Sequence, residues 1–79
     1  MDVVKTGSGV YQYRGVRIFK NKNGFSYWFT NVSKEYPVAS KTYPDSLKNV
    51  VAGLDVMLDR SDVSVENNRV ISGIAKVVA

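Results

Sequence analysis

The chain has 79 residues, of which 44% are hydrophobic and 23% charged, a composition typical of one small folded domain. It carries a formal net charge of +4 and contains neither cysteine nor histidine. This excludes disulfides, the common zinc sites and the nucleophilic triads that need either residue. We find neither a signal peptide nor an apolar run of the ~20 residues that span a bilayer. We therefore expect a cytoplasmic, non-enzymatic protein with no cofactor, no metal, no small-molecule substrate and no membrane partner.

The positive charge is concentrated in the first half of the chain. Residues 1–43 contain seven basic and two acidic residues, whereas residues 44–79 contain four basic and five acidic ones. A surplus of this kind attracts polyanions such as nucleic acid. The alternative explanation is that charged side chains keep the edges of a short sheet from pairing with other molecules.

The first half of the chain has the pattern of a small antiparallel sheet. Residues 1–10 contain two glycines and no periodic pattern, which predicts a flexible arm. Residues 11–20 and 25–32 are rich in aromatic and β-branched residues, which predicts two strands joined by a turn at "NKNG", residues 21–24. A third, shorter strand is predicted near residues 38–43.

A helix is predicted after the third strand, because the period of the apolar residues changes. Asp45 or Ser46 is the expected N-cap, and the helix is expected to end near Arg60. Gly53 lies in the middle, where we expect it to allow close approach to the sheet. The predicted apolar stripe consists of Leu47, Val50, Val51, Leu54, Met57 and Leu58.

The C-terminal residues 61–79 begin with a polar stretch and continue as "RVISGIAKVVA". Their apolar residues recur at helical spacing but are mostly β-branched, so we expect either a short C-terminal helix or an extended docking segment. The predicted fold class is α+β. Residues 11–60 form a β-β-β-α domain in which a three-stranded antiparallel sheet packs on one α-helix.

Alternation along the predicted strands separates a core face from an open face. The core face consists of Val16, Ile18, Phe25, Tyr27, Phe29 and Val38. The open face carries Arg17, Phe19, Trp28 and Lys41, with Arg14 nearby. A sheet face with a tryptophan, a phenylalanine and several bases is unusual for a surface without a partner. The alternative is that the C-terminal segment folds across this face and covers Trp28.

Acidic residues on the predicted helix do not indicate catalysis. Asp55 and Asp59 are one turn apart, with Asp62 close behind. Such a group can hold a hard cation, but it is more often a solvated acidic face, which is the interpretation we prefer.

The sequence "YRGVR" at 13–17 resembles the opening strand of the plant AP2/ERF DNA-binding domain, and "TYPDSLKNVVAGLD" at 42–55 resembles the start of its helix. The layout over residues 11–60 is also similar to the arm-binding domain of phage integrases. The resemblance to the AP2/ERF domain implies a three-stranded sheet backed by a helix, with the open face of the sheet entering the major groove. The resemblance assigns first-strand DNA contacts to Arg14, Gly15 and Arg17. Short bacterial and phage proteins with a "YRG" strand and a "SLxxV" helix look similar too, which implies no function.

The resemblance also has departures. Trp28 stands where the family carries a polar contact residue, and Ala39 falls near the family's groove-facing tryptophan. Only Lys20 and Lys22 represent the family's basic loop.

These patterns favour a DNA-binding domain that acts through the open, basic and aromatic sheet face. The candidate contact residues are Arg14, Arg17, Phe19, Lys20, Lys22, Trp28 and Lys41. The alternative is a protein-interaction or homodimerising domain, with basic residues at the rim of the interface and three buried aromatic anchors, namely Trp28, Phe19 and Tyr11.

Overall fold

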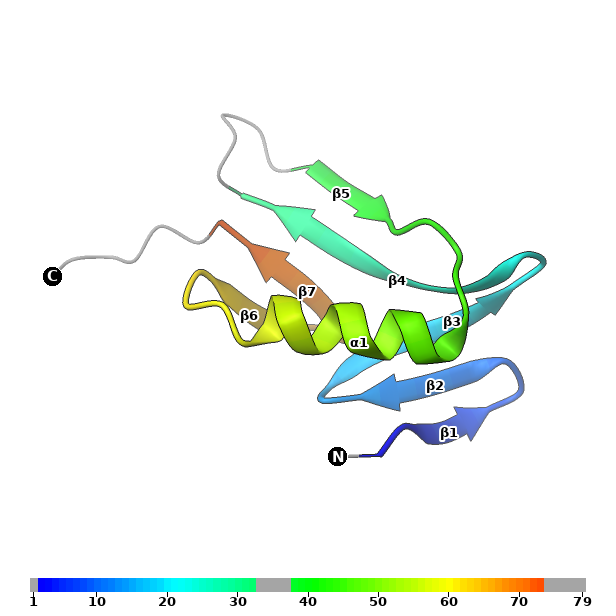
Figure 1. Ribbon diagram of the computed structural model, residues 1–79. Coiled ribbons are helices and arrows are strands. Elements are labelled where there is room, and N and C mark those ends of the chain that lie inside the picture. The colour runs from blue at the N-terminus through cyan, green and yellow to red at the C-terminus, as the bar shows by residue number, and fades with distance from the viewer. Residues whose placement is uncertain (1, 33–37, 74–79) are drawn as a thin grey trace, which may run out of the picture.

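The computed structural model describes residues 2–32 and 38–73. In chain order, its elements are β1 (Val4–Gly7), β2 (Val10–Tyr13), β3 (Val16–Asn21), β4 (Gly24–Asn31), β5 (Val38–Lys41), α1 (Leu47–Leu58), β6 (Val63–Glu66) and β7 (Arg69–Ser72). Figure 1 shows α1 crossing one face of a strongly curved sheet.

The described residues form a curled, mixed sheet of seven strands rather than three. The strand order is β1-β2-β3-β4-β7-β6, and β5 also pairs with β4. The pairing of β4 with β7 is parallel, whereas the other pairs are antiparallel. The predicted three-stranded sheet on one helix is therefore wrong. The single helix and the strands β4 and β5 lie where the sequence predicted them, but the first predicted strand is divided and three strands, β1, β6 and β7, were missed.

The predicted strand at 11–20 is divided by a turn. Tyr13 and Val16 face each other across β2 and β3, which leaves Arg14 and Gly15 as a two-residue loop. Their φ angles are +50° and +83°, the sign that a type I′ turn requires at both positions. The segment "YRGVR", on which the family resemblance rests, thus bends back on itself instead of running along one strand.

The segment expected to be a flexible arm contains β1. Val4 and Lys5 pair with Gln12 and Tyr11 of β2, and the register shifts between Lys5 and Gly7. The side chains of β1 are exposed, but the preceding Val3 packs against the core. Because β1 buries none of its side chains, its sequence carries no alternating apolar pattern.

The polar stretch after the helix forms a hairpin. Asn67 and Asn68 connect β6 to β7 with φ angles of +51° and +62°, which asparagine tolerates better than most residues. The alternative of a short C-terminal helix is wrong for residues 63–72, because β6 and β7 are extended strands and β7 pairs with β4 inside the sheet. Residues 74–79, which the prediction also covered, lie outside the described residues.

The predicted turn at 21–24 is confirmed, and it explains one glycine. Gly24 has a φ of +139°, and a Cβ there would come within 2.6 Å of the backbone oxygen of Asp45. This close approach accompanies a backbone bridge in which the N–H of Phe25 donates to Asp45 O at 2.7 Å. The bridge joins the beginning of β4 to the residue that precedes the helix cap.

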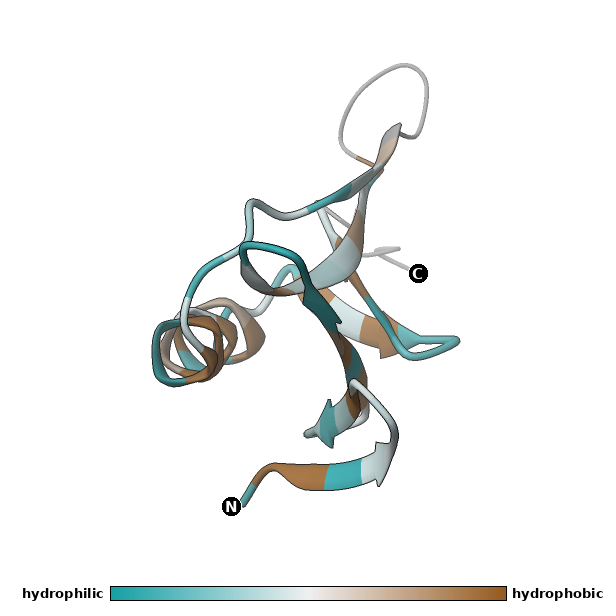
Figure 2. Cartoon of the chain, turned by 90° about the vertical axis from the view of Figure 1, so that its right-hand side faces the viewer, coloured by the Kyte–Doolittle hydropathy of each residue, from teal (hydrophilic) through white to brown (hydrophobic). Residues whose placement is uncertain are grey.

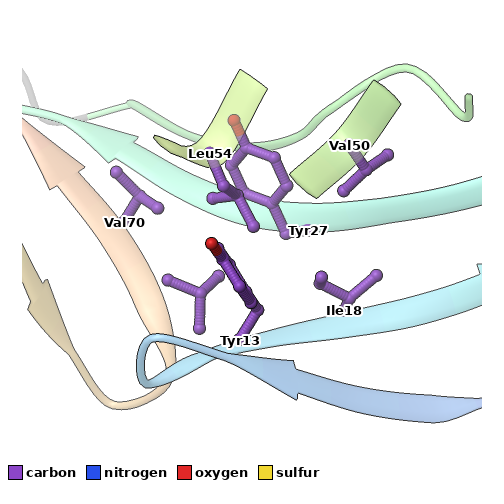
Figure 3. Packing of buried hydrophobic residues seen from close by; sticks show 7 residues of the cluster. Tyr13, Ile18, Tyr27, Val50, Leu54 and Val70 are labelled. Carbon is purple, nitrogen blue, oxygen red and sulfur yellow. The ribbon is translucent and has the colours of Figure 1, made fainter. Parts of the chain in front are cut away.

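The helix packs as its apolar stripe predicted. Ser46 caps it by accepting a hydrogen bond from the N–H of Asn49, and Asp59 is the C-cap. Val50 and Leu54 are buried, and the other four stripe residues pack against the core. Figure 3 shows six of the buried side chains meeting between α1 and the sheet, namely Tyr13, Ile18, Tyr27, Val50, Leu54 and Val70.

The predicted core face of the strands is confirmed for its described side chains. Val16, Ile18 and Tyr27 are buried, and Phe25 and Phe29 pack against them. The side chain of Val38 lies outside the described part. The expected role of Gly53 is wrong, because a Cβ at that position would meet no atom within 4 Å. Gly53 therefore faces away from the sheet.

Candidate nucleic-acid interface

A groove of about 370 Å³ lies on the face of the sheet that is turned away from the buried core. Strand alternation explains its position, because Arg17 and Phe19 alternate in β3 with the fully buried Val16 and Ile18. Figure 2 shows the helix on one side of the curved sheet only, which leaves the other side of the sheet uncovered by α1. The residues that line the groove are Arg17, Phe19, Trp28, Ala39, Asn67, Asn68 and Arg69.

Four segments line this groove, namely β3, β4, β5 and the β6–β7 turn with the first residue of β7. Trp28 is the central aromatic residue, and 43% of its surface is exposed. It belongs to β4, which is paired on both sides and is therefore held firmly in the sheet. The small side chain of Ala39 in β5 leaves space next to it. The turn between β6 and β7 closes the other side.

A backbone hydrogen bond fixes the turn against β3. The N–H of Arg17 donates to the backbone oxygen of Asn68 at 2.9 Å. The side chain of Gln12 also donates from Nε2 to Oδ1 of Asn68 at 3.1 Å. Because two neighbouring strands hold the turn, the side chains of Arg17 and Arg69 are presented from a rigid framework.

Lys41 adjoins the groove on the side of Phe19. It faces Trp28 across β4 and β5, and its ammonium group lies 6.0 Å from the centre of the Phe19 ring. That distance is at the outer limit of a cation–π contact. Lys41 Nζ also donates to Oδ1 of Asn21 at 2.6 Å. The positive charge of Lys41 therefore lies beside the groove, and one N–H of its ammonium group is engaged by Asn21.

The arginines divide into two groups. Arg14 and Arg60 each form ion pairs with aspartate side chains. Arg17 and Arg69 form no ion pair within the described residues, and both line the groove. The two arginines that have no carboxylate partner there thus line the same groove as the single tryptophan of the chain.

The structure brings together part of the predicted site. Arg17, Phe19 and Trp28 line the groove, and Lys41 adjoins it. Lys20 follows Phe19 in β3, so strand alternation places it on the side of Ile18. Lys22 lies in the exposed turn between β3 and β4.

Arg14 does not belong to the same face as Arg17. Its Nη1 lies 3.1 Å from Oδ1 of Asp55, and its Nη2 lies 3.1 Å from Oδ1 of Asp59. These two ion pairs place the Arg14 side chain on the helix side of the sheet, so the expected contact of Arg14 with DNA on the open face is not supported by its position.

The same contacts correct the interpretation of the helix carboxylates. Asp55 accepts a hydrogen bond from the Tyr13 hydroxyl at 2.7 Å, and this bond together with Arg14 lowers the pKa of Asp55. The bond to the carboxylate also raises the pKa of Tyr13. Asp55 and Asp59 therefore fasten the β2–β3 turn to the helix rather than forming a free acidic face. Among the described residues, no three acidic side chains gather into a metal site.

Sequence reasoning missed the contribution of Asn67, Asn68 and Arg69 to the groove. The signal was present in "VSVENNRVIS", where two alternating stretches flank two asparagines. Helical spacing of the apolar residues further along concealed this hairpin pattern.

Comparison with known proteins identifies no relative: no family matches the chain, and neither the curated proteins nor the solved structures contain a match. Within residues 2–32 and 38–73, no helix combines the length and the apolar character needed to cross a bilayer.

Proposed function

We propose that this protein is a non-enzymatic domain that binds nucleic acid, most simply DNA, through the groove. The observation that supports this most directly is the position of Arg17 and Arg69. Neither has a carboxylate partner among the described residues, and both lie beside the exposed ring of Trp28. Guanidinium groups bind phosphates through two parallel hydrogen bonds, and an aromatic ring contacts bases or sugars.

The distribution of the carboxylates also supports this proposal. Asp55 and Asp59 are engaged by Arg14 at the helix, and Asp62 is engaged by Arg60. Glu66 is the cross-strand partner of Arg69, but the two form no ion pair in the described part of the chain. Among the described residues, the groove is thus flanked by three cationic side chains, those of Arg17, Lys41 and Arg69, and by one carboxylate on β6.

A salt titration tests the proposal. Binding of a fluorescently labelled DNA should weaken steeply between 50 and 200 mM salt, roughly, because phosphate contacts release counterions. Arg17→Ala should lower the slope of log K against log salt by about one. Lys48→Ala is the matched control: it also removes one positive charge, but from the exposed surface of α1. Equal effects of the two variants would show that net charge alone drives binding and would contradict a site at the groove.

A charge change of the opposite sign provides a second test. Glu66→Gln removes the carboxylate opposite Arg69 and should strengthen binding at low salt. Asp62→Gln raises the net charge equally at a position that does not line the groove. A larger gain from Glu66→Gln is expected.

A protein-interaction or homodimerising domain is the second candidate, and the exposed Trp28 favours it. Binding centred on this ring would depend little on salt, so the same titration separates the two functions. A cytoplasmic location, expected from the sequence, belongs to both proposals.

A further inference from the structure

The size of the groove limits what it can receive. Its volume of about 370 Å³ is at the lower end of the ~300–1,000 Å³ that small-molecule pockets span. Such a space takes one flat ring system with its substituents. Proteins that read duplex DNA usually place a protruding helix or ribbon in the major groove, which is about 12 Å wide. Here the aromatic ring lies in a recess between the sheet and the β6–β7 turn.

The two aromatic residues of the groove are not equivalent. Phe19 has the ammonium group of Lys41 near its ring. No other ring of the described residues stacks on Trp28, and close to half of its surface is exposed. Trp28 therefore offers the free aromatic surface. A base in a duplex is already stacked on both faces, whereas an unpaired base gains by stacking on such a ring.

The polar residues at the wall suit the edge of a base. Asn67 and Asn68 present two side-chain amides, and the bond from Gln12 to Oδ1 of Asn68 leaves the amide nitrogen of Asn68 as a donor. Asn67 makes no side-chain hydrogen bond within the described residues and retains both a donor and an acceptor.

Two arginines of the groove are close neighbours of Asn68 in the backbone. Asn68 lies between Arg69, its neighbour in sequence, and Arg17, whose backbone N–H binds Asn68 O at 2.9 Å. Both arginines therefore line the same small recess. Phosphates that flank an inserted base are the anions that two guanidinium groups can bind at once.

Building on the proposed function, we infer that the groove binds single-stranded nucleic acid by taking up one unpaired base. The base stacks on Trp28, the amides of Asn67 and Asn68 bind its edge, and Arg17 and Arg69 bind the neighbouring phosphates. Double-stranded DNA is then the weaker ligand.

Because Trp28 is the single tryptophan, its fluorescence reports on this site directly. Three probes of equal length should be compared: an oligothymidylate, a duplex, and a strand in which abasic sugars replace the bases. The oligothymidylate should quench Trp28 and bind about tenfold more tightly than the abasic strand, since stacking of a base contributes ~1–3 kcal/mol, or roughly five- to 150-fold. The duplex should also bind about tenfold more weakly, with little quenching.

Variants show which residues bind the base, and their affinity is measured from the fluorescence anisotropy of a labelled probe. Trp28→Ala should weaken binding of the oligothymidylate about tenfold and leave the abasic strand unchanged, while Trp28→Phe keeps most of the affinity. Tyr43→Ala, which removes an exposed aromatic ring outside the groove, should change the affinity for neither the oligothymidylate nor the abasic strand. Arg17→Ala and Arg69→Ala should weaken both strands. The comparison of probes on the wild-type protein stands even where a variant is destabilised.

The outcomes separate this inference from the proposed function. If the abasic strand or the duplex binds as tightly as the oligothymidylate, insertion of a base is wrong and nucleic-acid binding stands. If none of the three probes binds at low salt, both proposals are wrong.

Discussion

The hydroxyl of Tyr13 donates a 2.7 Å hydrogen bond to Oδ1 of Asp55, a residue 42 positions further along the chain. Arg14 adds an ion pair to the same oxygen at 3.1 Å. Two consecutive residues at the β2–β3 turn therefore bind one side chain in the middle of α1. This contact ties the N-terminal hairpin to the helix on the side of the sheet opposite the groove.

The bond between Tyr13 and Asp55 should make stability depend on pH in the acid range. The folded-state pKa of Asp55 is lowered, first by the Tyr13 hydroxyl and then by Arg14, so the unfolded chain takes up this proton more readily. The stabilisation is therefore complete above the unfolded pKa of about 4 and is lost as the pH falls through the lower folded value. Asp45, whose pKa is lowered by Asn49 and by the N–H of Ser46, acts in the same direction.

Urea unfolding at pH 7 and at about pH 3 tests this prediction. Asp55→Asn should lose stability at pH 7 and show a smaller difference between the two pH values than the wild type. Asp62→Asn is the control, because it removes an equal charge from a local pair with Arg60. An unchanged pH dependence in Asp55→Asn would contradict the role of this contact.

Leu54→Ala should destabilise the protein strongly. Leu54 is fully buried between α1 and the sheet, and loss of a packed leucine costs about 2–5 kcal/mol, a large share of the stability of so small a domain. Val56→Ala shortens a side chain of the same helix that is 73% exposed, and it should change stability by less than about 0.5 kcal/mol. Similar melting temperatures for the two variants would show that the buried face of the helix is assigned wrongly.

Gly53→Ala should stabilise the protein by about 1 kcal/mol in urea unfolding. The added methyl group meets no atom within 4 Å, and alanine is the better helix former. Gly15→Ala is the contrasting variant. A Cβ added at residue 15 would lie at an ordinary 3.5 Å from Val65 Cγ1, so space is available. The φ of +83° at this residue should nevertheless lower the stability of the alanine variant by about 1–2 kcal/mol. A loss of stability in Gly53→Ala would mean that the helix approaches another part of the chain at this point.

Residues 4–7 should have a rigid backbone in solution, because β1 pairs with β2 and Val3 packs against the core. Heteronuclear relaxation should give order parameters near ~0.85 there, similar to those of β2. Values below about 0.6, with β2 remaining rigid, would restore the flexible arm that the sequence pattern predicted.

The sequence by itself determined the features that depend on local periodicity. The stripe from Leu47 to Leu58 identified the buried face of α1, because side chains three and four apart share one side of a helix. Alternation in β3 and β4 likewise separated Val16 and Ile18 from Arg17 and Phe19, because a strand must bury every second residue on a one-sided core.

Only the tertiary structure decided how many strands form and which residues meet. The chain turns at Arg14 and Gly15 because β2 pairs with β3 as a hairpin, and β1 pairs with the other edge of β2. The β-rich pattern of residues 11–20 did not reveal either pairing. The parallel pairing of β4 with β7 brings Arg69 to Trp28 across about half of the chain, and no local pattern specifies that contact. Strand pairing depends on the packing of distant segments around one shared core, so the groove that we propose as a binding site appears only when the sheet is complete.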